Sequence, residues 1–114
     1  MTTFDQREQA FEAKQAHEEE LKFKSTVRRN KWLGLWVAEK LGKTAAEADA
    51  YAAALIAAEL DGDSDETLAE KLRADFEKAG VAQSLHQIRR KMDELFAKAT
   101  QEIMTVATEV RDDL

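Results

Sequence analysis

The sequence predicts an all-α protein, a four-helix bundle with a long first helix and a mobile N-terminal arm. Three observations lead to this fold class. Residues that favour helices dominate, with 44% hydrophobic residues of which alanine supplies many, 7% aromatic and 35% charged. There is no proline. Gly42, Gly62 and Gly80 each follow an apolar stretch with helical spacing, where a left-handed glycine ends a helix.

Start signals follow each of these glycines. Thr44 and Ser84 are each followed three residues later by a glutamate or glutamine, which is the pattern of a capping box. Ser64 or Asp65 can cap the helix between them. The predicted helices therefore span residues 4–41, 45–60, 65–79 and 85–109. At 114 residues the chain has room for one domain with one modest core.

Each predicted helix carries apolar residues at the spacing of one face, and we expect these faces to form the core. In the first helix they lie only in the second half and are Leu33, Trp36, Val37 and Leu41. In the second they are Ala48, Tyr51, Ala52, Leu55, Ile56 and Leu60. In the third they are Leu68, Leu72 and Phe76. In the fourth they are Leu85, Ile88, Met92, Leu95, Phe96, Ala99, Ile103 and Val106 or Val110.

Residues 1–20 form the arm. Beyond the first methionine, its only large apolar residues are Phe4 and Phe11, which lie nearly on one side of a helix but give too weak a stripe to hold it on a bundle. High helix propensity with small anchors is typical of a segment that folds into the groove of a partner. The alternative is a solvated tail of no consequence. We expect the arm to be frayed or disordered in the free protein, and residues 21–114 to form the bundle domain.

The net charge of −6 is unevenly distributed. Residues 1–20 contain two basic and six acidic residues, whereas residues 21–43 contain seven basic residues and one acidic residue. A further basic cluster lies at Arg89–Lys91. Because of these two basic segments, the alternative function is that of a small RNA- or nucleotide-binding module. The net negative charge of the whole chain argues against binding to DNA. An alternative explanation is that these basic residues form solvent-exposed helix faces whose positive charge balances that of the acidic helices.

Catalysis finds little support in the sequence. His17 and His86 belong to no recognisable motif, and no residue set combines a nucleophile, a base and an oxyanion donor. The segment Asp61–Glu66 has the alternating aspartates of a calcium loop, but Glu66 replaces its glycine and Leu72 its bidentate glutamate. No glycine-rich phosphate loop occurs. We therefore expect a protein that is not an enzyme and holds no metal and no cofactor.

Three absences bear on location. The chain contains no cysteine, which permits a reducing compartment. Its first residues lack the apolar core of a signal peptide, and no apolar run is long enough to cross a membrane. We expect a cytoplasmic protein without direct membrane insertion.

The chain contains several long and unusual motifs. Those in the first helix are Phe4-Asp-x-Arg7-Glu-x-Ala10-Phe11-Glu-Ala-Lys14, Ala16-His17, Glu20-Leu21, Phe23-Lys24, Arg28-Arg-Asn-Lys31, Leu33-Gly-Leu-Trp36 and Ala38-Glu-Lys-Leu-Gly42. A second block comprises Val81, His86-Gln-Ile-Arg-Arg-Lys-Met92 and Leu95. Together these motifs resemble the zeta subunit of certain bacterial F-type ATP synthases, an ATPase-inhibitor family first catalogued as of unknown function. The resemblance covers nearly the whole chain.

The resemblance implies an inhibitor of ATP hydrolysis associated with the membrane-bound synthase through its catalytic head. Its mobile N-terminal segment would become helical on entering an interface of alpha and beta subunits near the gamma shaft. Phe4 and Phe11 would be apolar anchors, and Arg7, Glu8 and Lys14 would fix the register. Some family members are linked to weak nucleotide binding, which would suit the basic residues of this chain, although the resemblance assigns the site to no particular residues. Gln15 replaces an aromatic residue of the family, which thins the apolar stripe.

Overall fold

The computed structural model describes the backbone of residues 3–112 and the side chains of residues 6–10 and 12–106. The described chain consists of four helices, α1 (Thr3–Lys40), α2 (Ala45–Leu60), α3 (Asp65–Lys78) and α4 (Leu85–Asp112), and contains no strand. The predicted fold class is therefore confirmed. Helix α4 extends beyond the predicted end at residue 109, because neither glycine nor proline follows to stop it.

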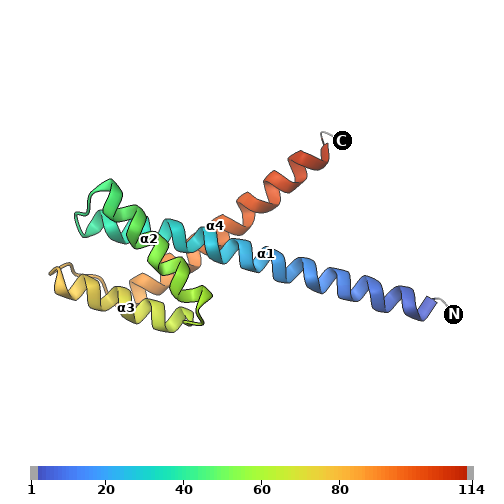
Figure 1. Cartoon of the computed structure of the whole chain (residues 1–114), viewed down its shortest axis with the longest axis horizontal. Coiled ribbons are helices and arrows are strands. Elements are labelled where there is room, and N and C mark those ends of the chain that lie inside the picture. Colours follow the sequence, from blue (N-terminus) through green and yellow to red (C-terminus); the bar gives the residue numbers. More distant parts are fainter. Residues whose placement is uncertain (1–2, 113–114) are drawn as a thin grey trace.

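Helix α1 runs along the longest dimension of the molecule, and the other three helices lie around its second half (Figure 1). Its second half packs against both α2 and α4, while α3 lies against α4 and α2. With 38 residues, α1 is about 57 Å long at 1.5 Å per residue, and it accounts for most of the molecule's largest extent of 64 Å. The N-terminal part of α1 and the C-terminal part of α4 diverge as they leave the bundle (Figure 1).

The helix ends follow the predicted signals. The side chain of Thr44 accepts a hydrogen bond from the backbone of Glu47, whose carboxylate accepts one in return from the backbone of Thr44. Ser84 and Gln87 form the same reciprocal box at the start of α4. Of the two candidates for α3, Ser64 is the cap. The three predicted glycine ends have positive φ, at Gly42 (74°), Gly62 (111°) and Gly80 (70°).

The core lies where the second half of α1 meets the other three helices. Its fully buried large side chains come mainly from α1, α3 and α4 and include Leu33, Val37, Leu68, Leu72, Phe76 and Ile88. Trp36 packs edge-on against Phe76, with ring centroids 5.8 Å apart. The hydroxyl of Tyr51 donates a 2.5 Å hydrogen bond to Asp75, which joins α2 to α3, and partial burial together with this carboxylate raises the pKa of the phenol.

Two residues predicted to face the core are exposed instead. Leu60 is 61% exposed because it is the last residue of α2 and lies at the edge of the bundle. Val106 is 51% exposed and lies on α4 beyond Ala99, the last buried residue of that helix among its described side chains. The apolar seam of α4 is continuously buried only as far as Ala99.

The crossing of α1 and α2 depends on a glycine inside a helix. A Cβ atom added to Gly34 would lie 2.4 Å from the Cα atom of Ala52 and 2.8 Å from its Cβ atom. Because the nearest atom belongs to the backbone, a side chain at this position would force the two helices apart. Glycine at position 34 therefore sets the close approach of α1 and α2.

Candidate functional site

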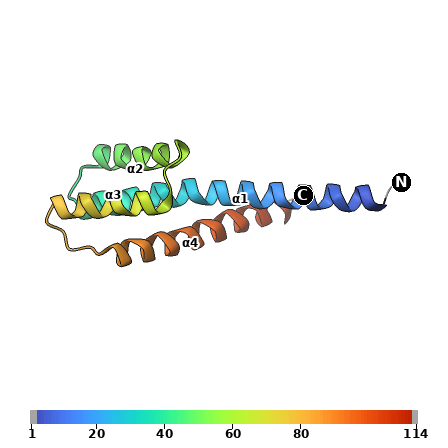
Figure 2. The ribbon, with the colours of Figure 1, turned by 90° about the horizontal axis from the view of Figure 1, so that it is seen from below.

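The N-terminal part of α1 extends from the bundle as a single unpacked helix (Figures 1 and 2). Every described side chain between Gln6 and Glu20 is exposed, and Leu21 is the first that is partly covered. Among the described side chains of this stretch, no ion pair or hydrogen bond reaches α2, α3 or α4. A helix whose described side chains are all exposed offers most of its circumference to a partner, which makes it the candidate site.

The residues predicted for partner binding all belong to this arm. Arg7, Glu8 and Lys14 are exposed, and the structure brings none of them to another helix. The side chains of Phe4 and Phe11 lie outside the described residues. The structure therefore presents the three charged residues to solvent on one helix, with Arg7 and Lys14 seven residues apart along it.

Where the arm enters the bundle, polar contacts begin. The first is an ion pair within α1, in which the Nζ atom of Lys24 lies 2.9 Å from a carboxylate oxygen of Glu20. This hydrogen bond lowers the pKa of the Glu20 carboxyl, and the positive charge of Lys24 adds to the effect. Both side chains are exposed, so the pair contributes little to stability.

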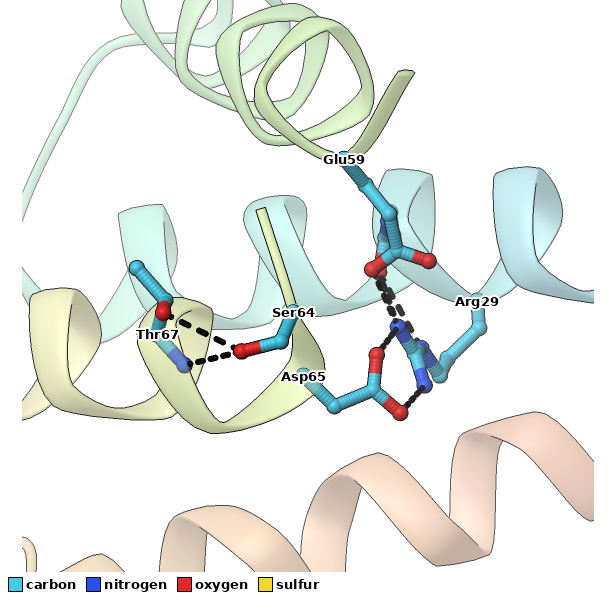
Figure 3. Close-up of polar contacts among 6 residues, drawn as sticks. Arg29, Glu59, Ser64, Asp65 and Thr67 are labelled. Carbon is cyan, nitrogen blue, oxygen red and sulfur yellow. Dashed lines mark hydrogen bonds and ion pairs between the residues drawn. The ribbon is translucent and has the colours of Figure 1, made fainter. Parts of the chain in front are cut away.

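The strongest contact at this end of the bundle is made by Arg29, whose side chain is 5% exposed (Figure 3). Its guanidinium donates to both carboxylate oxygens of Asp65, at 2.8 and 3.1 Å, and to Glu59 at 3.0 Å. It also donates to the side-chain oxygen of the buried Asn30. A bidentate arginine–carboxylate pair is both strong and directional. Arg29 thus fastens α1 to the end of α2 and the start of α3.

The two carboxylates around Arg29 have opposite pKa shifts. Burial raises the pKa of Glu59, because the charged form is poorly solvated there, and the charge of Arg29 only partly offsets this effect. The hydrogen bond from Arg29 lowers the pKa of Asp65. Asp65 is therefore the stable anionic partner of the guanidinium.

On its other side, α1 is fastened to α4. The hydroxyl of Thr100 donates a 2.8 Å hydrogen bond to the hydroxyl of Ser25, which is fully buried. Three residues after Ser25 on α1, Arg28 pairs with Glu102 of α4 at 3.0 Å. Ser25, Arg28 and Arg29, with their partners, form a set of contacts around the base of the arm that we call the collar. No buried side-chain nitrogen or oxygen in the described part of the chain lacks a hydrogen-bond partner.

Sequence reasoning did not identify the collar. It grouped Arg28 and Arg29 with the other basic residues of the segment 21–43, as a solvated face or a phosphate-binding surface. The spacing contained a signal, since Ser25 and Arg29 precede Leu33 and Val37 at intervals of four and continue the buried face of α1. Polar residues on that continuation indicate a face that stays buried after the apolar stripe ends.

The basic residues of the alternative function are largely engaged within the molecule. Arg89 pairs with Glu66, and Lys91 lies 3.6 Å from Glu94. The two tryptophans of α1 are partly buried and covered by lysines, with Lys98 over the ring of Trp32, and Lys40 and Lys91 over that of Trp36. Such pairing reduces the charge available to an anionic ligand.

Other sequence candidates have structural explanations. In the turn that resembled a calcium loop, Asp63 pairs with Lys71 at 2.7 Å, Ser64 caps α3, and Asp65 binds Arg29. His17 and His86 are both exposed. Within the described residues, no group of three or more histidine, cysteine or acidic side chains has the arrangement of a metal site. No helix among those residues has the length and apolar character needed to cross a membrane.

Comparison with known proteins identifies the family. A family model described as ATPase inhibitor subunit zeta matches residues 1–102, which include the whole arm and most of α4. A solution NMR structure is similar, with 36% identity and a TM-score of 0.63 over 75% of this chain and 96% of that one. No curated protein matches. The match over residues 1–102 shows that the chain belongs to the ATPase inhibitor subunit zeta family.

Proposed function

We propose that this protein inhibits ATP hydrolysis by the F-type ATP synthase by inserting its arm into an interface between alpha and beta subunits near the gamma shaft. The observation that supports this proposal is the arm itself, a helix whose described side chains are all exposed while the rest of α1 is held in a packed bundle. A chain with an inhibitory role needs a part that reaches its target. This arm is the longest unpacked element of the described structure.

The mechanism is steric. A catalytic interface that must open and close in each cycle is blocked when a helix occupies the space between its two subunits. The stretch Gln6–Glu20 is about 22 Å long at 1.5 Å per residue, and a helix with its side chains is about 10 Å across. An inhibitor of this kind needs no nucleophile, metal or cofactor, because it acts by occupying volume.

The apolar and the charged residues of the arm would have different roles in binding. Phe4 and Phe11 would enter apolar pockets of the catalytic interface, since they are the large apolar side chains of the segment. Arg7, Glu8 and Lys14 would set the register through charged partners on the alpha and beta subunits. Because α1 continues unbroken from the arm into the bundle, the collar would hold the inserted helix at a fixed angle.

The test is a chain that lacks residues 1–20, titrated into an ATP hydrolysis assay with the purified synthase. We expect the truncated chain to remain helical and to melt cooperatively, because every residue that the structure describes as buried lies beyond position 20. We also expect it to lose inhibition. A full-length chain whose first 20 residues are shuffled is the matched control for length and composition, and it should fail to inhibit as well. Full inhibition by either variant would contradict insertion of the arm.

A further inference from the structure

An apolar hollow lies beside the base of the arm, where α1 passes the end of α2. It has a volume of about 440 Å³. Its apolar lining comes from Phe23 and Val27 on α1 and from Ile56 and Leu60 on α2, and we call these four residues the base patch. The charged residues Glu19, Lys22 and Glu59 also line the hollow.

Two of the four base-patch residues are exposed, and the other two, Val27 and Ile56, are half-buried. Phe23 is 56% exposed and Leu60 is 61% exposed, and both belong to the small set of large hydrophobic side chains that are exposed in the described structure. Exposed apolar side chains gathered around a hollow and bordered by charges of both signs are typical of a protein-binding surface. Inside the bundle such residues would have been covered, as Leu33 and Leu68 are.

The position of the base patch indicates what covers it. Phe23 lies three residues beyond Glu20, which is about 4.5 Å along the helix axis. The C-terminal end of α2 lies beside α1 on the side of the bundle from which the arm emerges, in both views (Figures 1 and 2). A partner that encloses the arm up to Glu20 therefore reaches Phe23 and Leu60.

We propose that the base patch is a second docking surface, which receives apolar side chains from the part of the ATP synthase that surrounds the entrance for the arm. The inference rests on the proposed function, because it takes the arm's partner as its own. In this arrangement the arm blocks the catalytic interface, and the base patch packs against the synthase around the site where the arm enters. Burying Phe23 and Leu60 slows dissociation, since apolar contacts made only in the complex must be broken before the arm withdraws.

The chain offers a matched pair of variants for testing this proposal. The double variant Phe23→Ser/Leu60→Ser removes the two exposed apolar side chains of the base patch. Val106→Ser is the control, because Val106 is 51% exposed on α4 and does not line the hollow. Both variants should melt almost as the unmodified chain does, because the substituted side chains are largely exposed in the free protein.

The readout is the concentration that gives half-maximal inhibition of ATP hydrolysis. We expect the double variant to require on the order of tenfold more protein, as loss of about one buried apolar side chain implies. Val106→Ser should leave the value unchanged. Equal potency of the two variants would overturn the docking proposal while the arm mechanism stands. If the unmodified chain itself does not inhibit, or if the chain without residues 1–20 inhibits fully, the proposed function fails and the docking proposal fails with it.

A second measurement reports contact directly. Since the sequence contains no cysteine, Leu60→Cys and Val106→Cys each introduce a single thiol. Alkylation of the thiol is followed by mass spectrometry of the inhibitor, free and bound to the synthase. We expect binding to slow alkylation at position 60 at least several-fold and to leave position 106 unchanged. An unchanged rate at position 60 in the inhibited complex would overturn the proposal.

Discussion

Arg29 is the residue that most firmly connects the base of the arm to the rest of the molecule. Its guanidinium lies in a largely buried position and satisfies Asp65, Glu59 and Asn30 at once. It also lies 6.0 Å from the ring centre of Phe96 on α4. A single side chain from α1 therefore contacts the end of α2, the start of α3 and α4. Removing it leaves two carboxylates without their cation.

Replacement of Arg29 tests this role. Arg29→Met keeps much of the aliphatic volume but removes the charge, and we expect a loss of about 2–4 kcal/mol in the free energy of unfolding, because breaking a buried pair leaves uncompensated polar groups. The neighbouring Arg28→Met is the control, since its pair with Glu102 is exposed and should cost less than about 1 kcal/mol. Urea denaturation followed by circular dichroism gives both values. Equal losses would show that Arg29 is no more important than a surface arginine.

Acid sensitivity should depend on Asp65. Its pKa is lowered in the folded protein, so its ionisation stabilises the fold above its ordinary pKa of 3.8, and this contribution is lost as the pH falls through the lowered value. Between about pH 5 and about pH 2, the stability of Asp65→Asn should therefore fall less steeply than that of the unmodified chain. Urea midpoints measured across this range give the two slopes. Parallel slopes would exclude Asp65 as the acid-sensitive partner of Arg29.

Glu59 should make stability depend on pH in the opposite direction from Asp65. Its pKa is raised in the folded protein, so its contribution to stability is present below the ordinary pKa of 4.5 and is lost as the pH rises through the raised value. Replacing it with glutamine removes this titration. In a series of urea midpoints from about pH 4 to about pH 7, Glu59→Gln should gain stability relative to the unmodified chain as the pH rises. A constant difference between the two chains would contradict the raised pKa.

At the scale of elements, the packing of α1 on α2 depends on Gly34. Alanine is usually the better helix residue by about 1 kcal/mol, so Gly34→Ala would stabilise an isolated helix. Here we expect the reverse, a loss of about 1–3 kcal/mol, because the new methyl group would overlap the backbone of Ala52. Thermal melting measures the change, and Lys31→Ala at an exposed position of the same helix is the control. A stabilised Gly34→Ala variant would contradict the close helix crossing.

The two halves of α1 should differ in stability although they form one continuous helix. An unpacked helix of this length is marginal in water, because most helical stability comes from tertiary contacts. We expect backbone amides from Gln6 to Glu20 to exchange with deuterium within seconds, and those around Leu33 to be protected up to global unfolding. Amide exchange followed by NMR separates the two halves. Equal protection along α1 would contradict the predicted mobile arm.

For the whole molecule, the sequence was sufficient to predict the four helices, their caps and most of the core. These features depend on local signals, such as the box at Thr44 and the stripe Leu68, Leu72 and Phe76, and local signals can be read from one chain. The exposure of Leu60 and Val106 could not be predicted in this way, because periodicity shows which residues share a face but not where the neighbouring helix ends. The collar was missed because charged residues are normally assigned to the surface.

The candidate site likewise has one part that could be predicted from the sequence and one part that could not. The arm could be recognised from its poor apolar stripe and from the resemblance of its motifs to a known family. The base patch could not, because it combines residues from α1 and α2 that only the packing of the two helices brings together. Binding residues within one helix are thus accessible to sequence reasoning, whereas a surface built from two helices requires the fold.

The most direct test of arm insertion is photocrosslinking in the inhibited complex. A photoreactive residue placed at Gln9 on the exposed arm is compared with one at Lys78, which is exposed at the C-terminal end of α3. Both chains should still inhibit ATP hydrolysis, because neither position has an assigned role in binding. The account predicts that the probe at position 9 crosslinks to alpha or beta subunits and that the probe at position 78 does not. A fully inhibited complex in which the probe at position 9 yields no adduct with either subunit would contradict insertion of the arm.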